Sequence, residues 1–144
     1  MNREILFKGK RKDTKDWVFG HLVQCVDIVL IFPRGKEFYY DELEKFAFDM
    51  TAYEVIPKTV GQYTGIKDKN GKKIFEGDII KVTNDYGIIE VLDSDTGIGV
   101  VEFYDGYWYI AEQVNNSLYE IGRCYYIEII GNIHDTPELL EEPL

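Results

Sequence analysis

The sequence has few of the residues from which catalytic sites are built. Among its 144 residues are two histidines, two cysteines and only two serines, Ser94 and Ser117. Neither serine has the Gly-x-Ser-x-Gly setting of a hydrolase nucleophile, and no glycine-rich loop carries the lysine of a phosphate-binding motif. We therefore predict no catalytic residues and expect that the chain is not an enzyme.

The cysteines and histidines do not form a metal-binding pattern. Zinc sites use closely spaced Cys and His pairs, and the sequence has no Cys-x-x-Cys. His21 and Cys25 would share one face of a strand, but about 13 Å apart at roughly 3.3 Å per residue. We expect no metal and no other cofactor. We also expect Cys25 and Cys124 to be reduced core residues of a cytoplasmic protein.

Long hydrophobic runs and positive charge are also scarce. No apolar stretch approaches the roughly 20 residues of a membrane-spanning helix, and the opening MNREILFKGK lacks the apolar region of a secretion signal. Lys and Arg number 16 against 26 Asp and Glu, which leaves a formal net charge of −10. Phosphate backbones repel such a chain, so direct nucleic-acid binding is disfavoured, although lysines cluster at residues 8–15 and 67–73.

Aromatic residues are abundant, with eleven Tyr, eight Phe and two Trp. Aromatic and β-branched residues favour strands, and short apolar runs alternate with turn residues along the chain. The expected strands cover residues 5–7, 17–23, 28–32, 53–56, 79–83, 88–92, 98–104, 107–111, 118–121 and 126–133. The spacing of Leu43, Phe46 and Ala47 predicts a short helix over residues 41–48, although the flanking aromatic residues equally allow a strand. Pro137 begins a predicted helical turn, with Thr136 as its N-cap.

This pattern predicts a mainly β fold. Asp105-Gly106 favours a two-residue type I′ hairpin, since both central residues of that turn need a positive φ. We predict an irregular N-terminal β subdomain over residues 1–56 and a small antiparallel β-barrel of the Src-homology-like kind over residues 57–136. A short helical turn or tail would follow over residues 137–144. Closing the barrel would remove exposed sheet edges.

Residues 60–82 contain the strongest motif of the chain. A polar turn over residues 67–71 ends in Asn70-Gly71, a pair suited to the positive φ angles of a hairpin. Gly77 lets the chain diverge into the next strand, and Asp78 can accept a hydrogen bond from the turn backbone. Most of the motif is therefore explained by backbone requirements, although loops held by a rigid scaffold also carry binding groups.

The sequence GQYTGIKDKNGKKIFEGDII at residues 61–80 resembles the central motif of the YopX family of bacteriophage and prophage proteins. The strand EIIGNI at residues 128–133 and PELL at residues 137–140 look like the ending of that family, and REILFKGK and WVFG look like its opening. The resemblance implies a mostly β architecture, a phage context and self-association. It implies no established activity and no catalytic residues.

Two segments form the predicted interaction surface. One is the exposed region beside the central turn, and the other is the hairpin at Asp105-Gly106, where alternation places Tyr107 and Tyr109 on one face and Trp108 on the other. The candidate residues are Gln62, Tyr63, Lys69, Tyr107, Trp108 and Tyr109. Aromatic residues are enriched at protein interfaces, and ordinary cross-strand packing is the alternative explanation of the hairpin cluster.

We therefore predict a phage or prophage accessory protein that acts as a self-associating protein–protein interaction module, with an unknown host or phage protein as a further partner. The alternative is a nucleic-acid-related role. In that role the chain would use its lysine clusters, or it would mimic DNA and bind a basic protein. A hydrolase with a pair of carboxylates in a cleft is a third alternative.

Overall fold

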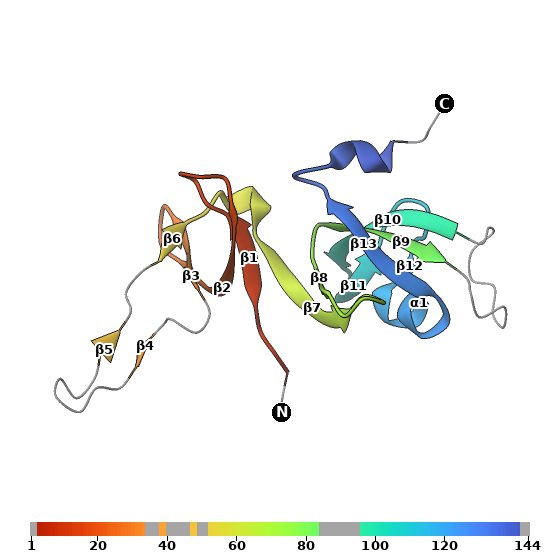
Figure 1. Ribbon diagram of the computed structural model, residues 1–144, viewed down its shortest axis with the longest axis horizontal. Coiled ribbons are helices and arrows are strands. Elements are labelled where there is room, and N and C mark those ends of the chain that lie inside the picture. The colour runs from red at the N-terminus through yellow and green to blue at the C-terminus, as the bar shows by residue number, and fades with distance from the viewer. Residues whose placement is uncertain (1–2, 34–37, 40–46, 49–51, 84–95, 142–144) are drawn as a thin grey trace. The chain divides into compact units, whose positions relative to one another are not determined.

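The computed structural model describes residues 3–33, 38–39, 47–48, 52–83 and 96–141. The chain forms two compact units, Met1–Tyr63 and Thr64–Leu144 (Figure 1). Both consist mainly of antiparallel strands, which confirms the predicted mainly β fold. Among the described helices, none is both long and apolar enough to cross a membrane.

The first unit contains five strands of a six-stranded antiparallel sheet with the order β6-β3-β2-β1-β7-β8, whose last strand, β8 (Lys73–Phe75), belongs to the second unit. Its strands are β1 (Phe7–Lys10), β2 (Trp17–Gln24), β3 (Val29–Pro33), β6 (Tyr53–Glu54) and the start of β7 (Gly61–Lys67), which follows the 3-10 turn η1 (Pro57–Thr59). The short strands β4 (Phe38–Tyr39) and β5 (Ala47–Phe48) pair with each other. Val18, Ile31 and Val55 form the buried core, which agrees with the apolar character expected of these strands.

The second unit is a five-stranded sheet with the order β12-β11-β10-β9-β13. Its elements are β8 (Lys73–Phe75), β9 (Asp78–Thr83), β10 (Thr96–Tyr104), β11 (Tyr107–Ile110), β12 (Asn116–Ser117), helix α1 (Leu118–Cys124), β13 (Tyr126–Asn132) and the 3-10 helix η2 (Pro137–Leu140). The core includes the fully buried Ile80, Val82 and Ile110 of the sheet and Leu118 and Ile121 of α1.

Residues 118–121 form the first turn of α1, so the predicted strand there is wrong. The Ser117 Oγ accepts a hydrogen bond from the Glu120 N–H at 3.0 Å, which caps the helix. Leu118 and Ile121, three residues apart, then both face the core. A helix therefore stands where the barrel needed a strand. The described strands form an open order rather than a closed barrel, and the barrel prediction is not confirmed.

Other local predictions also need correction or lie outside the description. Ala47–Phe48 is a strand, so the end of the predicted helix over residues 41–48 is wrong, and residues 41–46 lie outside the described residues. The predicted strand at residues 88–92 lies outside them as well. Cys25 is exposed rather than part of the core, because the chain has left β2 and turns there, whereas Cys124 packs against the core.

The predicted C-terminal helical turn is present as η2. Thr136 does not cap it through its side chain. Its Oγ1 instead accepts a hydrogen bond from the Asn132 N–H at 3.2 Å. This contact ties the residue to the end of β13.

Candidate functional site

The hairpin that joins β10 and β11 carries the largest group of exposed aromatic residues within one described element pair. Asp105 and Gly106 have φ angles of 52° and 88°, and Tyr104 pairs with Tyr107 across them. Two positive φ angles in a two-residue loop are the features of the predicted type I′ turn. The strands therefore continue in register to the tip of the hairpin.

The core-facing side of the hairpin ends in an aromatic pair. Phe103 lies opposite Trp108, and the two rings meet edge to face with their centroids 5.1 Å apart. The next inward pair on this face, Val101 and Ile110, is fully buried. Trp108 packs against that core, whereas 57% of Phe103 is exposed. The apolar face thus extends beyond the core.

The opposite side of the hairpin is a tyrosine cluster. The ring centroid of Tyr109 lies 5.5 Å from that of Tyr104 and 6.0 Å from that of Tyr107. Desolvation raises the pKa of the Tyr109 phenol, and repulsion from Tyr107, Tyr104 and Glu102 raises it further. The Tyr109 hydroxyl donates a hydrogen bond to Asn115 Oδ1 at 3.2 Å. Tyr109 is therefore neutral at physiological pH, and the three tyrosines present apolar ring faces with polar tips.

The outer edge of β11 is only partly covered by β12. Ser117 pairs with Tyr109 and Asn116 pairs with Ile110, but the next residue, Leu118, already belongs to α1. The edge of β11 at Tyr107 and Trp108 therefore extends beyond β12. Exposed strand edges are templates for pairing with another chain.

The predicted candidate residues lie in different units. Tyr107, Trp108 and Tyr109 are together on the hairpin. Gln62 and Tyr63 belong to β7 in the first unit. Tyr63 is buried, with 6% of its surface exposed, and its N–H donates to the Leu6 carbonyl at 2.8 Å. Its position is that of a core residue rather than of a recognition residue.

Lys69 lies in the turn between β7 and β8. Its N–H donates to the Ile127 carbonyl at 2.8 Å, and its Nζ lies 3.9 Å from the Glu128 carboxylate. Neighbouring Asp68 is buried and accepts hydrogen bonds from the N–H groups of Asn70, Lys72 and Ile129. The turn is thus attached to β13 through its backbone, while the Lys69 side chain remains partly exposed.

The first unit carries a second group of aromatic and basic residues. The Nζ atoms of Lys8 and Lys10 lie 4.5 and 5.6 Å from the centre of the Trp17 ring. The Arg11 guanidinium lies 3.9 Å from the centre of the Tyr53 ring. Among the described residues, no three His, Cys, Asp or Glu side chains are grouped to hold a metal ion.

Phe103 and Tyr104 belong to the aromatic cluster that flanks the Asp105-Gly106 turn in the sequence, and they are more exposed than the hairpin candidates Tyr107, Trp108 and Tyr109. One feature of the hairpin site was not predicted. The open edge of β11 depends on where α1 begins. The capping pattern Ser117-x-x-Glu120 indicated that start.

Comparison with known proteins supports the architecture and identifies the family. The crystal structure of protein EF1440 from Enterococcus faecalis is similar to this chain, with a TM-score of 0.61, 22% sequence identity, and coverage of 96% of this chain and 99% of that one. This similarity shows a shared fold. No curated protein matches the chain significantly. The family model described as YopX protein matches residues 6–141, nearly the whole sequence, and the chain therefore belongs to the YopX family.

Proposed function

We propose that the protein is a non-catalytic interaction module of a phage or prophage that associates with a second copy of itself through the β10–β11 hairpin. One observation carries this proposal: the hairpin exposes aromatic side chains on both faces, beside a strand edge that β12 leaves uncovered. The phage context rests on membership of the YopX family. A cytoplasmic location in the host cell and a further host or phage protein partner belong to the same proposal.

The exposed rings supply the attraction. Phe103, Tyr104 and Tyr107 are 57%, 58% and 42% exposed. Burial of aromatic surface is favourable, and tyrosine also offers a hydroxyl for hydrogen bonding at an interface. Cross-strand packing explains how the rings pair within the hairpin, but it leaves much of their surface in water. A partner that covers both faces of the tip would bury that remainder.

The strand edge supplies the geometry. The Ala111 N–H donates to the Val100 carbonyl, and hydrogen-bonded pairs alternate with non-hydrogen-bonded pairs along an antiparallel ladder. Phe103 and Trp108 lie three pairs nearer the turn than Val100 and Ala111, so they form a non-hydrogen-bonded pair. The backbone polar groups of Trp108 consequently point toward the outer edge of β11. Two β11 edges related by a twofold axis can pair there, as a closed dimer requires.

Loss of the exposed rings tests the proposal. The double variant Tyr104→Ala, Tyr107→Ala should have a lower mass than the wild type by sedimentation or light scattering at the same concentration. Tyr119→Ala is the matched control, because Tyr119 is a 62% exposed tyrosine on α1 outside the hairpin. A wild type that is monomeric at every concentration, or a double variant with unchanged mass, would refute self-association through the hairpin.

The nucleic-acid alternative has weaker support. In the cluster at residues 8–15, Arg11 forms an ion pair with Asp13 at 2.7 Å and Lys12 forms one with Glu54 at 2.9 Å. Lys8 and Lys10 lie over Trp17, so this cluster already has partners within the chain. A gel shift at two salt concentrations tests the alternative, because binding to phosphates weakens steeply as salt rises.

A further inference from the structure

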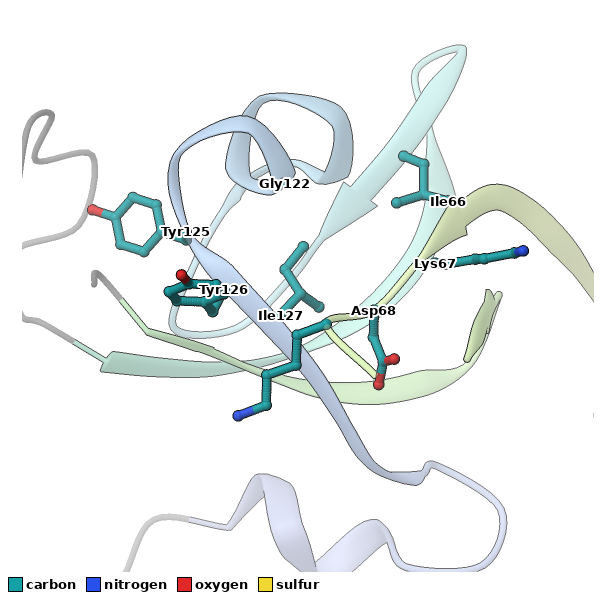
Figure 2. A pocket seen from close by; sticks show the side chains of 8 residues that line it. Ile66, Lys67, Asp68, Gly122, Tyr125, Tyr126 and Ile127 are labelled. Atoms are coloured by element: carbon teal, nitrogen blue, oxygen red, sulfur yellow. The ribbon is translucent and has the colours of Figure 1, made fainter. Parts of the chain in front are cut away.

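A pocket lies in the second unit beside the lysine-rich turn, on elements separate from the hairpin tip. Its volume is about 240 Å³, and Figure 2 shows its walls. The end of β7 and the following turn form one wall, helix α1 forms another, and the start of β13 forms the third. The lining residues are Ile66, Lys67, Asp68, Lys69, Gly122, Tyr125, Tyr126 and Ile127.

The backbone of the pocket is fixed by hydrogen bonds between its walls. The Lys69 N–H donates to the Ile127 carbonyl at 2.8 Å, and the Ile129 N–H donates to the Asp68 carboxylate at 3.1 Å. At the end of α1, the Tyr125 N–H donates to the Ile121 carbonyl at 2.8 Å. The pocket therefore exists before any partner arrives, which lowers the ordering cost of binding.

The pocket combines apolar and cationic surface. Ile66 and Ile127 contribute aliphatic side chains, and Tyr126 contributes a ring that is 40% exposed. Lys67 extends outward from the end of β7 (Figure 2), and Lys69 is 44% exposed with a loose contact to Glu128. Pockets that recognise a partner commonly pair an apolar interior with a few polar groups that fix orientation.

The turn beside the pocket carries a net charge opposite to that of the whole chain. Residues 67–73 contain four lysines and one aspartate, a formal charge of +3 in a protein of −10. Asp68 is committed to three backbone N–H groups, of which those of Asn70 and Lys72 hold the turn closed. This local excess of positive charge attracts a negatively charged partner.

Gly122 keeps one wall of the pocket open. It lies on α1, and a Cβ atom added there would make ordinary contact with Ile127 Cδ1 at 3.6 Å. Alanine therefore fits at this position without displacing its neighbours. A longer side chain would have to extend into the pocket. This position offers a way to fill the pocket without changing any lysine.

We infer that this pocket binds an acidic peptide segment of a partner protein. An apolar side chain of the segment enters between Gly122 and Ile127, and flanking carboxylates pair with Lys67 and Lys69. A free phosphate would use the lysines but leave the aliphatic walls uncovered. This site is independent of the self-association proposed for the hairpin, since it shares no residue with the tip.

Short fluorescein-labelled peptides test the pairing of charge with an apolar group. We expect the protein to bind EEFEE, to bind EEGEE more weakly because nothing enters the pocket, and not to bind the charge-reversed KKFKK. Fluorescence anisotropy reports each affinity. Equal binding of EEFEE and EEGEE would overturn the role of the pocket. Tighter binding of short oligo-dT than of EEFEE would show that the site recognises phosphates, and would overturn the proposal.

Two pairs of variants locate the site. Lys67→Ala with Lys69→Ala should weaken EEFEE binding by about fivefold, given the usual strength of exposed ion pairs, whereas the control Lys12→Ala should have no effect. Gly122→Leu should abolish binding and Gly122→Ala should preserve it. A circular dichroism spectrum identical to that of wild type establishes that each variant is folded. Unchanged binding by folded Gly122→Leu would refute the assignment.

The hairpin variants separate the two proposals. Tyr104→Ala, Tyr107→Ala should retain the wild-type affinity for EEFEE, even where its self-association is lost. Gly122→Leu should in turn retain the wild-type mass. A Gly122→Leu variant that becomes monomeric would show that a second copy occupies the pocket, which would overturn the proposal of a different partner protein.

Discussion

At the scale of single residues, Asp68 illustrates how one carboxylate organises several segments. Burial raises its pKa, but hydrogen bonds from the N–H groups of Ile129, Lys72 and Asn70 lower the pKa further than burial raises it, so the net shift is downward. The carboxylate is therefore ionised in the folded protein at neutral pH. The carboxylate holds the β7–β8 turn closed. It also joins the turn to β13, which lies far along the sequence.

Replacement of Asp68 by Asn should destabilise the second unit by about 1–3 kcal/mol at neutral pH, because an amide cannot accept all three hydrogen bonds. The folded-state pKa is below the unfolded value of about 3.9. The stabilising contribution is therefore present above that value and is lost as the pH falls through the folded-state pKa. Urea unfolding followed by circular dichroism, at neutral and acidic pH, measures this.

Asp105→Asn is the matched control for that experiment. Asp105 is an exposed aspartate in a turn with a positive φ, which asparagine tolerates. It should leave the free energy of unfolding unchanged at both pH values. A destabilisation of Asp68→Asn that is equally large in strong acid would contradict the role assigned to the ionised carboxylate.

At the scale of secondary-structure elements, helix α1 determines how much of β11 is exposed. The helix begins directly after β12, and it packs on both β11 and β12. If α1 began one residue later, β12 would be one residue longer and would cover one more residue of β11. The candidate interaction edge at Tyr107 and Trp108 thus exists because the chain turns into a helix at Leu118.

Ser117→Ala removes the side-chain cap of α1 and should destabilise the second unit by about 1 kcal/mol. The expected result is a lower thermal midpoint, measured by the loss of circular dichroism. Ser117→Asp is the control, because aspartate also caps helices and should preserve most of the stability. An alanine variant as stable as the wild type would show that packing alone holds the first turn of α1.

Turns and strands were easier to predict from the sequence than the edges of the sheet. The hairpin follows from the preference of the adjacent residues Asp105 and Gly106 for positive φ angles. The structure has that turn. Residues 118–121 were predicted as a strand because they are a short apolar run, although Leu118 and Ile121 have helical spacing and Ser117 begins a capping box. The exposed edge of β11 depends on pairing with residues later in the chain, which no local pattern specifies.

The candidate site was predictable only in part for a similar reason. Alternation correctly separated Trp108 from Tyr107 and Tyr109 on the two faces of β11. The position of Tyr63 beside the polar central turn predicted a surface residue, yet it is buried beside Leu6. Burial of a residue at a polar motif depends on which strand lies beside it, and β1 is distant from β7 in sequence.

At the scale of the whole molecule, the net charge of −10 opposes association between copies. Raising the salt concentration from 0.01 to 0.1 M shortens the Debye length from about 30 to about 10 Å. Self-association through the hairpin should therefore strengthen over this range, which sedimentation at matched protein concentration measures. Binding of EEFEE at the lysine-rich turn should weaken over the same range. Self-association that weakens with salt would indicate contacts between opposite charges instead of the aromatic hairpin.

The link between the two units has a consequence for inheritance. Strand β7 pairs with β1 through Gly61 and Gln62, and the unit boundary then falls within it, between Tyr63 and Thr64. Just past that boundary, the Thr64 hydroxyl donates to the Ile74 carbonyl in β8. Exchange of protein modules by recombination is best tolerated in exposed linkers. A crossover here would have to preserve the register of one strand on both sides, so we expect the two units to be inherited together as a single block.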